Sequence, residues 1–169
     1  YNGNAKLLGN FTATVISNDS DATGIYAVLS DTAASGADGV ITIGKNLILD
    51  IIAEEGESYG IYGAGKYNKT TIFGDALIIA QGDTAVGIGA VRSANVSILG
   101  NTTIVATGQS ETEAVYALGG ATVNLGSTGK TVDLTGDVEA NGAGSAITLA
   151  GKTNTINGTK SALNGGTVN

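Results

Sequence analysis

Residues 98–108 read ILGNTTIVATG: a short apolar segment, a glycine, a polar residue and a second apolar segment. Closely related phrases stand at 41–53 (ITIGKNLILDIIA) and 70–82 (TTIFGDALIIAQG), with weaker copies at 7–17 and 123–136. Glycine adopts backbone angles that other residues resist, so each phrase predicts a strand, a sharp corner and another strand. The glycines that align the copies are Gly9, Gly44, Gly74, Gly100 and Gly126. Their spacing of 35, 30, 26 and 26 residues, obtained by subtraction, indicates an internal repeat.

A second phrase recurs out of step with the first. It reads GIYAVL at 24–29, GIYGAG at 60–65, GIGAVR at 87–92, AVYALG at 114–119 and SAITLA at 145–150. One cycle of the repeat therefore contains three short strands: one before the glycine corner, one after it, and the Gly-Ile-Tyr strand. Three strands per cycle without a helix-length periodic segment predict an all-β fold, a right-handed parallel β-helix of about five coils.

An antiparallel β-sandwich is the alternative with the same strand-forming composition. It requires tight hairpin turns, for which Asn-Gly is the strongest signal. Every Asn-Gly pair of the chain lies outside the regular stretch 40–126. The β-helix is therefore favoured. We interpret residues 1–169 as one segment of a longer repeat protein, with 151–169 as an irregular cap or truncated coil that loses a strand.

Composition and charge exclude several classes of function. The chain has no His and no Cys, which removes the catalytic triad, thiol nucleophiles and the usual transition-metal sites. Its net charge of −7 at pH 7 is unsuited to nucleic acid or an anionic membrane. No apolar run approaches the length of about 18 residues that spans a bilayer, so we expect no direct membrane insertion of this segment. No motif points to a cofactor, and we expect none.

The alternation of side chains along a strand assigns them to the core or to the surface. The inward ladder before the corner is expected to be Leu8, Ile43, Phe73, Leu99 and Leu125. The inward ladder after the corner is expected to be Leu49, Ile79, Val105 and Val132. The same alternation turns Ile48, Ile78 and Ile104 outward as an exposed apolar row. Such a row is either a binding stripe or a sign that the alternation is misassigned in this strand, and both interpretations stay open.

Three tyrosines, Tyr26, Tyr62 and Tyr116, share one position in the Gly-Ile-Tyr strand. In the copy at 145–150, two apolar residues flank Thr148, a pattern that favours an inward tyrosine stacked in the core. The alternative is an aromatic platform for sugar rings on the outer surface.

Acidic residues gather in the loop that precedes the Gly-Ile-Tyr strand. In a stack of coils they would form a ridge along the axis: Asp19, Asp21, Glu54, Glu55, Glu57, Asp83, Glu111, Glu113, Asp137 and Glu139. The ridge is a candidate for divalent metal ions or for a basic partner; the alternative is a solvated corner whose charge keeps the sheets soluble. Paired carboxylates are also the only remaining catalytic groups. A polysaccharide-acting enzyme would need carboxylates beside an Arg or Lys, for which Asp83 near Arg92 is one candidate. The regularity of the ridge argues against an active site, and we assign no catalytic residue.

Several short stretches resemble the passenger region of Gram-negative autotransporters: GIYA (24–27), AVYALGG (114–120), TVNLG (122–126) and SILGNTTI (97–104), on a Gly-, Thr- and Asn-rich background without Cys. The resemblance covers essentially the whole chain. It is closer to adhesin-like passengers than to protease ones, because a chain without His cannot form a serine-protease triad. It implies a right-handed β-helical stalk that is secreted through the outer membrane and displayed on the bacterial cell surface.

We therefore expect a structural and binding segment of a surface-displayed adhesin. Its partner would be a protein or glycan on another cell or matrix surface, or a second copy of itself, bound by non-covalent contacts along a rigid rod. Two alternatives stay open: a polysaccharide-acting β-helix, such as a lyase, hydrolase or phage tailspike, and a spacer without a ligand. The segments 30–39 and 54–60 depart from the repeat, and we expect binding there because irregular loops often carry binding residues.

Overall fold

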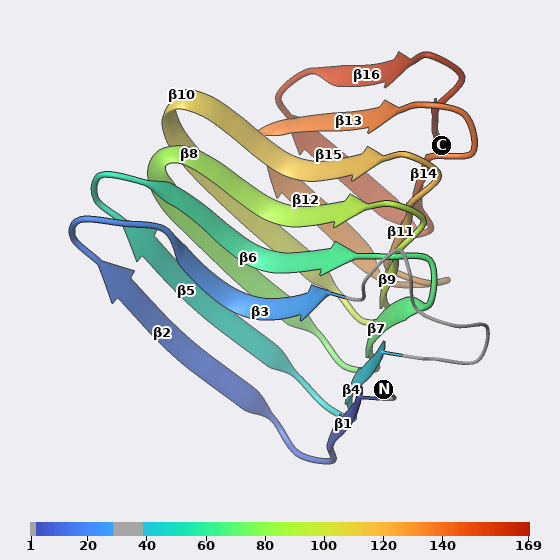
Figure 1. Ribbon diagram of the computed structural model, residues 1–169. Helices are drawn as coiled ribbons and strands as arrows, with labels where there is room; N and C mark the ends of the chain where they lie inside the picture. Colours follow the sequence, from blue (N-terminus) through green and yellow to red (C-terminus); the bar gives the residue numbers. More distant parts are fainter. Residues whose placement is uncertain (1–2, 29–38) are drawn as a thin grey trace.

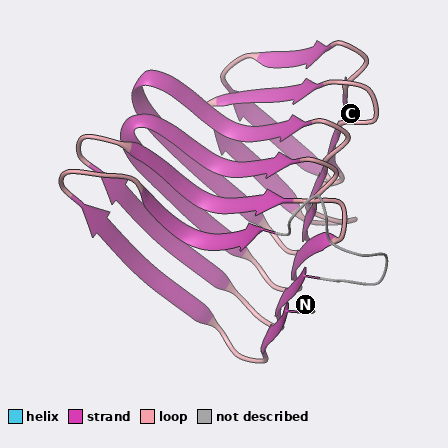
Figure 2. Ribbon diagram, in the orientation of Figure 1, coloured by secondary structure: helices cyan, strands magenta, loops and turns pink. Residues whose placement is uncertain are grey.

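The computed structural model describes residues 3–28 and 39–169, and the chain runs through β-strands in both parts (Figures 1 and 2). The strands are β1 (Gly3–Leu7), β2 (Phe11–Ser17), β3 (Ala22–Val28), β4 (Gly39–Ile43), β5 (Leu47–Ala53), β6 (Glu57–Ala64), β7 (Asn68–Ile72), β8 (Ala76–Val91), β9 (Asn95–Ile98), β10 (Thr102–Leu118), β11 (Thr122–Leu125), β12 (Thr131–Thr135), β13 (Asp137–Asn141), β14 (Ala146–Leu149), β15 (Thr153–Asn157), β16 (Lys160–Leu163) and β17 (Thr167–Val168). No helix occurs in these two ranges, so the prediction of an all-β fold is confirmed. Most of the segment 30–39, where we expected binding, lies outside the described residues.

The strands form two sheets of parallel pairs. Seven strands pair in the order β1-β4-β7-β9-β11-β14-β17, and ten strands form the second sheet. The second sheet has two arms: the first contains β2, β5, β12 and β15, the second contains β3, β6, β13 and β16, and the long strands β8 and β10 run through both. Figure 1 shows the two arms folded toward each other, with the seven-stranded sheet beside their open ends.

Each strand pairs with the equivalent strands of the neighbouring cycles. In the seven-stranded sheet, for example, Ile72 is opposite Ile98, and Ile98 is opposite Leu125. The fold is thus a set of stacked sheets in which parallel strands repeat in register. This arrangement is compatible with the predicted β-helix.

Ladders of aliphatic side chains fill the space between the sheets. One ladder contains Ile43, Ile72, Ile98 and Leu125, all fully buried. Another contains Leu49, Ile78, Ile104 and Leu134, of which none is more than 1% exposed. Burial of each such side chain contributes about 1.5–3 kcal/mol, so these ladders are a major source of stability.

Part of the inward ladder predicted before the corner is wrong. Leu8 is 71% exposed, Phe73 55% and Leu99 38%. The reason is that the corner glycines are not equivalent positions. Gly44 directly follows the buried Ile43, whereas one outward residue separates the buried Ile72 from Gly74. Of the predicted members, only Ile43 and Leu125 lie in the core.

The predicted exposed row of Ile48, Ile78 and Ile104 is also wrong. Ile78 and Ile104 are fully buried, and only Ile48 points outward, with 43% of its surface exposed. The hydrogen-bonded register pairs Ile48 with Leu77, and Leu49 with Ile78. Two residues separate Gly44 from β5, whereas one separates Gly74 from β8 and one separates Gly100 from β10. Aligning on the glycine therefore slips the strand by one residue, and such a slip exchanges the two faces of a strand.

The same slip of one residue makes two of the four residues predicted for the inward ladder after the corner wrong. Leu49 and Val132 are buried, but Ile79 and Val105 alternate with buried residues and lie opposite each other on the outer face.

A ladder of side-chain hydrogen bonds runs along the corner between the seven-stranded sheet and the first arm. The backbone N–H of Asn46 donates to Asn10 Oδ1 at 3.3 Å, and the N–H of Asp75 donates to Asn46 Oδ1 at 3.0 Å. The N–H of Asn101 donates to Asp75 Oδ1 at 2.8 Å, and that of Thr131 to Asn101 Oδ1 at 3.1 Å. The polar residue of each corner therefore satisfies a backbone donor in the next cycle.

The two arms converge at the corner between them, where small residues occupy the interior. Ala80, Ala85 and Ala106 form a separate buried cluster there. Gly87 faces the same interior: a Cβ atom on it would overlap Cγ2 of Ile104 and lie 2.6 Å from the carbonyl oxygen of Ala114. Residues without bulk thus allow the second arm to fold back closely over the first.

Residues 151–169 continue the strand pattern. β15, β16 and β17 pair with β12, β13 and β14, respectively. The segment therefore does not lose a strand, contrary to our expectation. Its role as a cap stays a prediction.

The assignment of faces predicts unequal effects for two neighbouring residues of β10. Ile104→Ala should lower the free energy of unfolding by about 2–5 kcal/mol, because it removes a buried side chain and leaves a cavity. Val105→Ala should cost less than about 1 kcal/mol, because this side chain lies on the outer face. Denaturant titration followed by circular dichroism measures both changes. Equal losses for the two variants would contradict the assignment.

Candidate binding surface

The outer face of the second arm carries a row of tyrosines. Tyr26 in β3 is opposite Tyr62 in β6, and Tyr62 is opposite Gly89 in β8. Gly89 is in turn opposite Tyr116 in β10. Tyr26 is 67% exposed, and the rings of Tyr62 and Tyr116 are half-buried.

The prediction that these tyrosines lie in the core is wrong, and the alternative arrangement on the outer surface is observed. The segment 145–150 is not a copy of the Gly-Ile-Tyr strand, because its Ile147 pairs with Val123 in the seven-stranded sheet. The residue opposite Tyr116 is instead Glu139. The core position beside each tyrosine belongs to the preceding residue, such as the fully buried Ile61.

The rings of three tyrosines contact one another in two geometries. The rings of Tyr26 and Tyr62 stack with centroids 5.6 Å apart and planes 12° apart. Tyr59 meets Tyr62 edge to face, at 5.2 Å and 72°. A Cβ on Gly89 would lie 3.3 Å from Cδ2 of Tyr62 and 3.6 Å from Cδ1 of Tyr59, so the glycine allows both rings to lean over the backbone of β8. Each aromatic pair contributes about 0.5–1.5 kcal/mol beyond its buried area.

Tyr59 belongs to this surface although the repeat does not reveal it. Its register position is held by Thr23, Val86 and Glu113 in neighbouring cycles, so no pattern marks it as aromatic. The in–out alternation of β6 is interrupted between Tyr59 and Tyr62, because the two residues between them, Gly60 and Ile61, are both buried. Both tyrosine rings therefore lie on the outer face.

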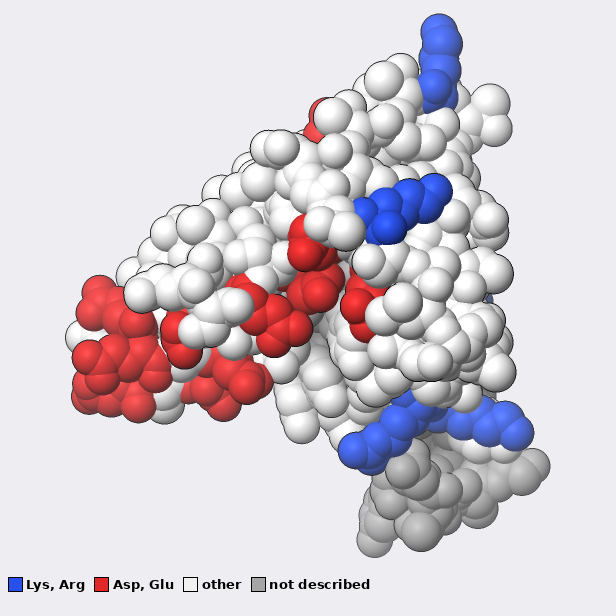
Figure 3. Space-filling model, turned by 90° about the horizontal axis from the view of Figure 1, so that it is seen from above, with Lys and Arg blue, Asp and Glu red and all other residues white. Residues whose placement is uncertain are grey.

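The structure brings the predicted acidic residues together beside the rings. Glu57 and Glu111 are both opposite Thr84 of β8, and Glu113 is opposite Val86 and Asp137. The exposed members of the ridge are Asp19, Asp21, Glu54, Glu55, Glu57, Asp83 and Glu111. Figure 3 shows acidic atoms gathered at one corner of the molecule and continuing along one side. We call Asp21, Tyr26, Glu57, Tyr59, Tyr62, Glu111, Glu113, Tyr116 and Glu139 the aromatic–acidic face.

Glu113 is the most perturbed carboxyl group of this face. Burial, followed by the negative charges of Glu139, Asp137 and Glu111, raises its pKa from 4.5 to about 7. Its Oε2 atom is buried and has no hydrogen-bond partner among the described residues. A carboxyl group in such surroundings is protonated part of the time at neutral pH, and it then becomes a hydrogen-bond donor.

Hydrogen bonding orients one wall of the face. The hydroxyl group of Tyr59 donates to Glu57 Oε2 at 2.8 Å, and the backbone N–H of Glu57 donates to Asp21 Oδ1 at 3.0 Å. Burial, followed by the hydrogen bond to Glu57, raises the pKa of Tyr59. Burial and the charges of Glu139, Glu111 and Glu113 likewise raise the pKa of Tyr116. Both hydroxyl groups therefore keep their protons at neutral pH, and that of Tyr59 acts as a donor to Glu57.

A depression of about 220 Å³ lies among these groups. It is lined by Asp21, Thr23, Tyr26, Glu57, Tyr59 and Tyr62. Aromatic walls with a few polar groups are the usual composition of a ligand site.

The candidate catalytic pair Asp83 and Arg92 is not brought together. Asp83 lies at the corner between the arms, where it accepts a hydrogen bond from Ser110 Oγ at 2.7 Å. Arg92 follows the far end of β8, nine residues further on, which corresponds to roughly 25–30 Å of extended chain.

Within residues 3–28 and 39–169, no three His, Cys, Asp or Glu side chains are grouped so that they could hold a metal ion. The ridge therefore offers no defined geometry for the divalent metal ion considered from the sequence. The described part of the chain also has no helix that is long and apolar enough to cross a membrane.

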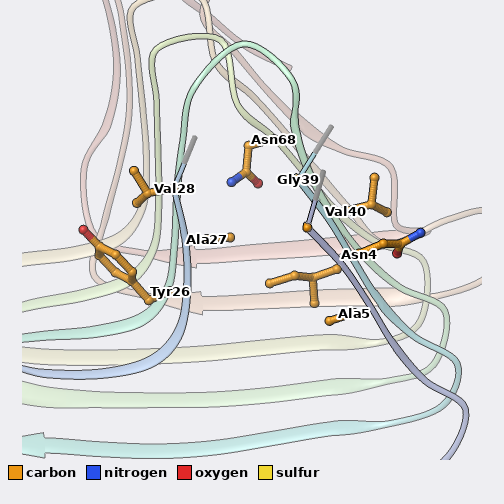
Figure 4. A pocket seen from close by; sticks show the side chains of 10 residues that line it. Asn4, Ala5, Tyr26, Ala27, Val28, Gly39, Val40 and Asn68 are labelled. Carbon is orange, nitrogen blue, oxygen red and sulfur yellow. The ribbon is translucent and has the colours of Figure 1, made fainter. Parts of the chain in front are cut away.

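A larger depression, of about 390 Å³, lies among β1, β3 and β4 (Figure 4). Asn68, only 2% exposed, is among the residues that line it. Its other lining residues are mostly small or apolar, such as Ala5, Ala27 and Val28, and we assign no site there.

Searches against protein-family models, curated proteins and solved structures found no match to this chain. The function is therefore argued from the aromatic–acidic face.

The raised pKa of Glu113 predicts how stability depends on pH. In the unfolded chain its carboxyl group has the ordinary pKa, so the folded chain binds more protons between about pH 4.5 and 7. Glu113 therefore destabilises the fold increasingly as the pH rises through this range. Glu113→Gln should unfold with a free energy higher than that of the original chain by about 1–2 kcal/mol near pH 8, a value reduced for partial screening by solvent. The difference should vanish near pH 4.

Unfolding titrations of both proteins across this pH range measure the effect. A constant difference between the two proteins at every pH would show that Glu113 keeps its ordinary pKa in the fold.

Proposed function

We propose that this chain is a non-covalent binding segment of a surface-displayed, β-helical adhesin. The observation that carries the proposal is the outward row of tyrosines bordered by carboxylates. Large aromatic rings are usually kept from water, and where they gather on a surface they commonly serve as binding anchors. A row held on a sheet is also rigid, so little conformational entropy is lost on binding.

The stacked sheets support the architecture in this proposal, a closed right-handed parallel β-helix. The seven strands of the first sheet suggest about six coils, one more than the repeat phrases alone. A rod of this kind repeats its outer face once per coil, which suits multivalent contact with an extended glycan or protein. Secretion and surface display belong to the proposal through the resemblance to autotransporter passengers. Antibody labelling of intact cells that express the parent protein tests them, and labelling only after lysis would oppose them.

The binding proposal predicts that Tyr62 is an anchor, because its ring contacts both Tyr26 and Tyr59. The chain is to be screened against immobilised glycans and extracellular-matrix proteins. For a ligand found in this way, Tyr62→Ala should weaken binding about 10-fold or more.

Tyr67→Ala is the matched control. This tyrosine contacts Lys66 in the turn after β6, away from the face, so its loss should leave affinity unchanged. Equal effects of the two substitutions would place the ligand elsewhere. A screen in which the chain binds nothing would favour a spacer without a ligand.

A second candidate function is glycan hydrolysis, which the environment of Glu113 favours. A carboxyl group with a pKa raised to about 7 beside a second carboxyl group is what a glycosidase uses as general acid. Incubation with neutral and acidic polysaccharides should then release new reducing ends, and Glu113→Gln should abolish the release. Absence of new ends with either protein would exclude this function for the polysaccharides tested.

A further inference from the structure

We propose that the depression lined by Asp21, Tyr26, Glu57, Tyr59 and Tyr62 binds the ammonium or guanidinium group of a Lys- or Arg-rich segment of another protein. This inference rests on the proposed binding function and names the chemistry of its ligand. It is carried by the geometry of the rings, by the carboxylates that share the depression with them, and by the charge of the surface beyond it.

The rings form two walls of a cage. Tyr59 stands at 72° to Tyr62 with their centroids 5.2 Å apart, so the two rings present differently directed faces around one corner. Tyr26 stacks on Tyr62 and is itself 67% exposed, so it adds an accessible ring to the lining. The face of an aromatic ring carries negative electrostatic potential, and cages of such rings are a known means of recognising cationic groups.

The carboxylates supply the charge that the rings lack. Asp21 and Glu57 line the same depression as the tyrosines. The hydroxyl group of Tyr59 donates a hydrogen bond to Glu57 at 2.8 Å, and this bond polarises the O–H group so that the ring becomes richer in electrons. A cation in the depression would thus meet ring faces and carboxylate oxygens together, which is the combination that ammonium and guanidinium groups prefer.

The acidic surface continues beyond the depression and selects the class of partner. Glu111, Glu113 and Glu139 follow it across the strands β10 and β13, which are spaced by about 4.8 Å from their neighbours. A single small cation would use only the cage, whereas a segment with several basic side chains would use the cage and this surface. The net charge of −7 repels an anionic membrane surface, so a membrane of that kind is not the expected partner.

The test measures binding of a short acetylated and amidated oligo-arginine peptide by calorimetry, with an oligo-glutamine peptide of the same length as control. The original chain should bind the arginine peptide and not the glutamine peptide. Tyr62→Leu, which keeps an apolar side chain but removes the ring, should weaken binding about 10-fold, and Glu57→Gln should do the same. Tyr67→Leu should leave it unchanged. Tyr59→Phe keeps the ring and loses the bond to Glu57, so its effect should be smaller than that of Tyr62→Leu.

Several outcomes would overturn the proposal. If Tyr62→Leu binds the arginine peptide as well as the original chain does, and about 0.5 M salt abolishes binding by both, the attraction is only that of the acidic surface. If phosphatidylcholine vesicles bind and the peptide does not, the cation belongs to a lipid. If neutral glycans bind in a Tyr62-dependent manner and the peptide does not, the cation proposal fails while the proposed binding function stands. If neither glycans, matrix proteins nor the peptide bind, both fail.

Discussion

Parallel pairing between equivalent strands of successive cycles is the constraint on which the rest of this structure depends. It places each residue above its counterpart, so one choice of side chain in the repeat becomes a ladder along the whole molecule. Inward positions become continuous aliphatic ladders such as Leu49, Ile78, Ile104 and Leu134. At the polar corner the same register lets Asn10, Asn46, Asp75 and Asn101 each accept a hydrogen bond from the backbone of the next cycle.

On the outer face of the second arm, the same register is favourable for the tyrosines and unfavourable for the carboxylates. Stacked tyrosines gain from their neighbours, as the parallel rings of Tyr26 and Tyr62 show. Stacked carboxylates are costly: burial first, and then the charges of Glu139, Asp137 and Glu111, raise the pKa of Glu113. A fold that keeps such a row gives up some stability for it, which is a common property of functional surfaces.

The shape of the interior decides where this face lies. Small side chains at the corner between the arms, among them Ala80, Ala85, Ala106 and Gly87, let the two arms of the ten-stranded sheet converge. The turns that join the arms then bring the acidic residues to one corner of the molecule (Figure 3). The rings of Tyr59 and Tyr62 lie over β8 because Gly89 presents no side chain beneath them.

The sequence by itself determined the strand composition, the internal repeat, the three strand types and the gathering of acidic residues before the Gly-Ile-Tyr strand, because these depend on local propensity and on recurrence. It also identified Tyr26, Tyr62 and Tyr116 as one row. It did not show that most of those acidic residues lie in strands, such as Glu111 and Glu113 in β10. Only the tertiary structure decided which face each side chain takes. The corner glycine is the first of the three residues between β4 and β5 but the second of three between β7 and β8 and between β9 and β10. An alignment on the glycines is therefore one residue out of register, and in a strand a shift of one residue exchanges inside and outside. Hence Ile78 and Ile104 are buried and Phe73 is exposed. The tyrosines point to solvent, contrary to the prediction, because 145–150 pairs in the seven-stranded sheet and is not a copy of their strand. Tyr59 lies on the same face because the in–out alternation of β6 is interrupted at Gly60 and Ile61. The repeat does not show this interruption, because it depends on hydrogen bonds between residues far apart in the chain.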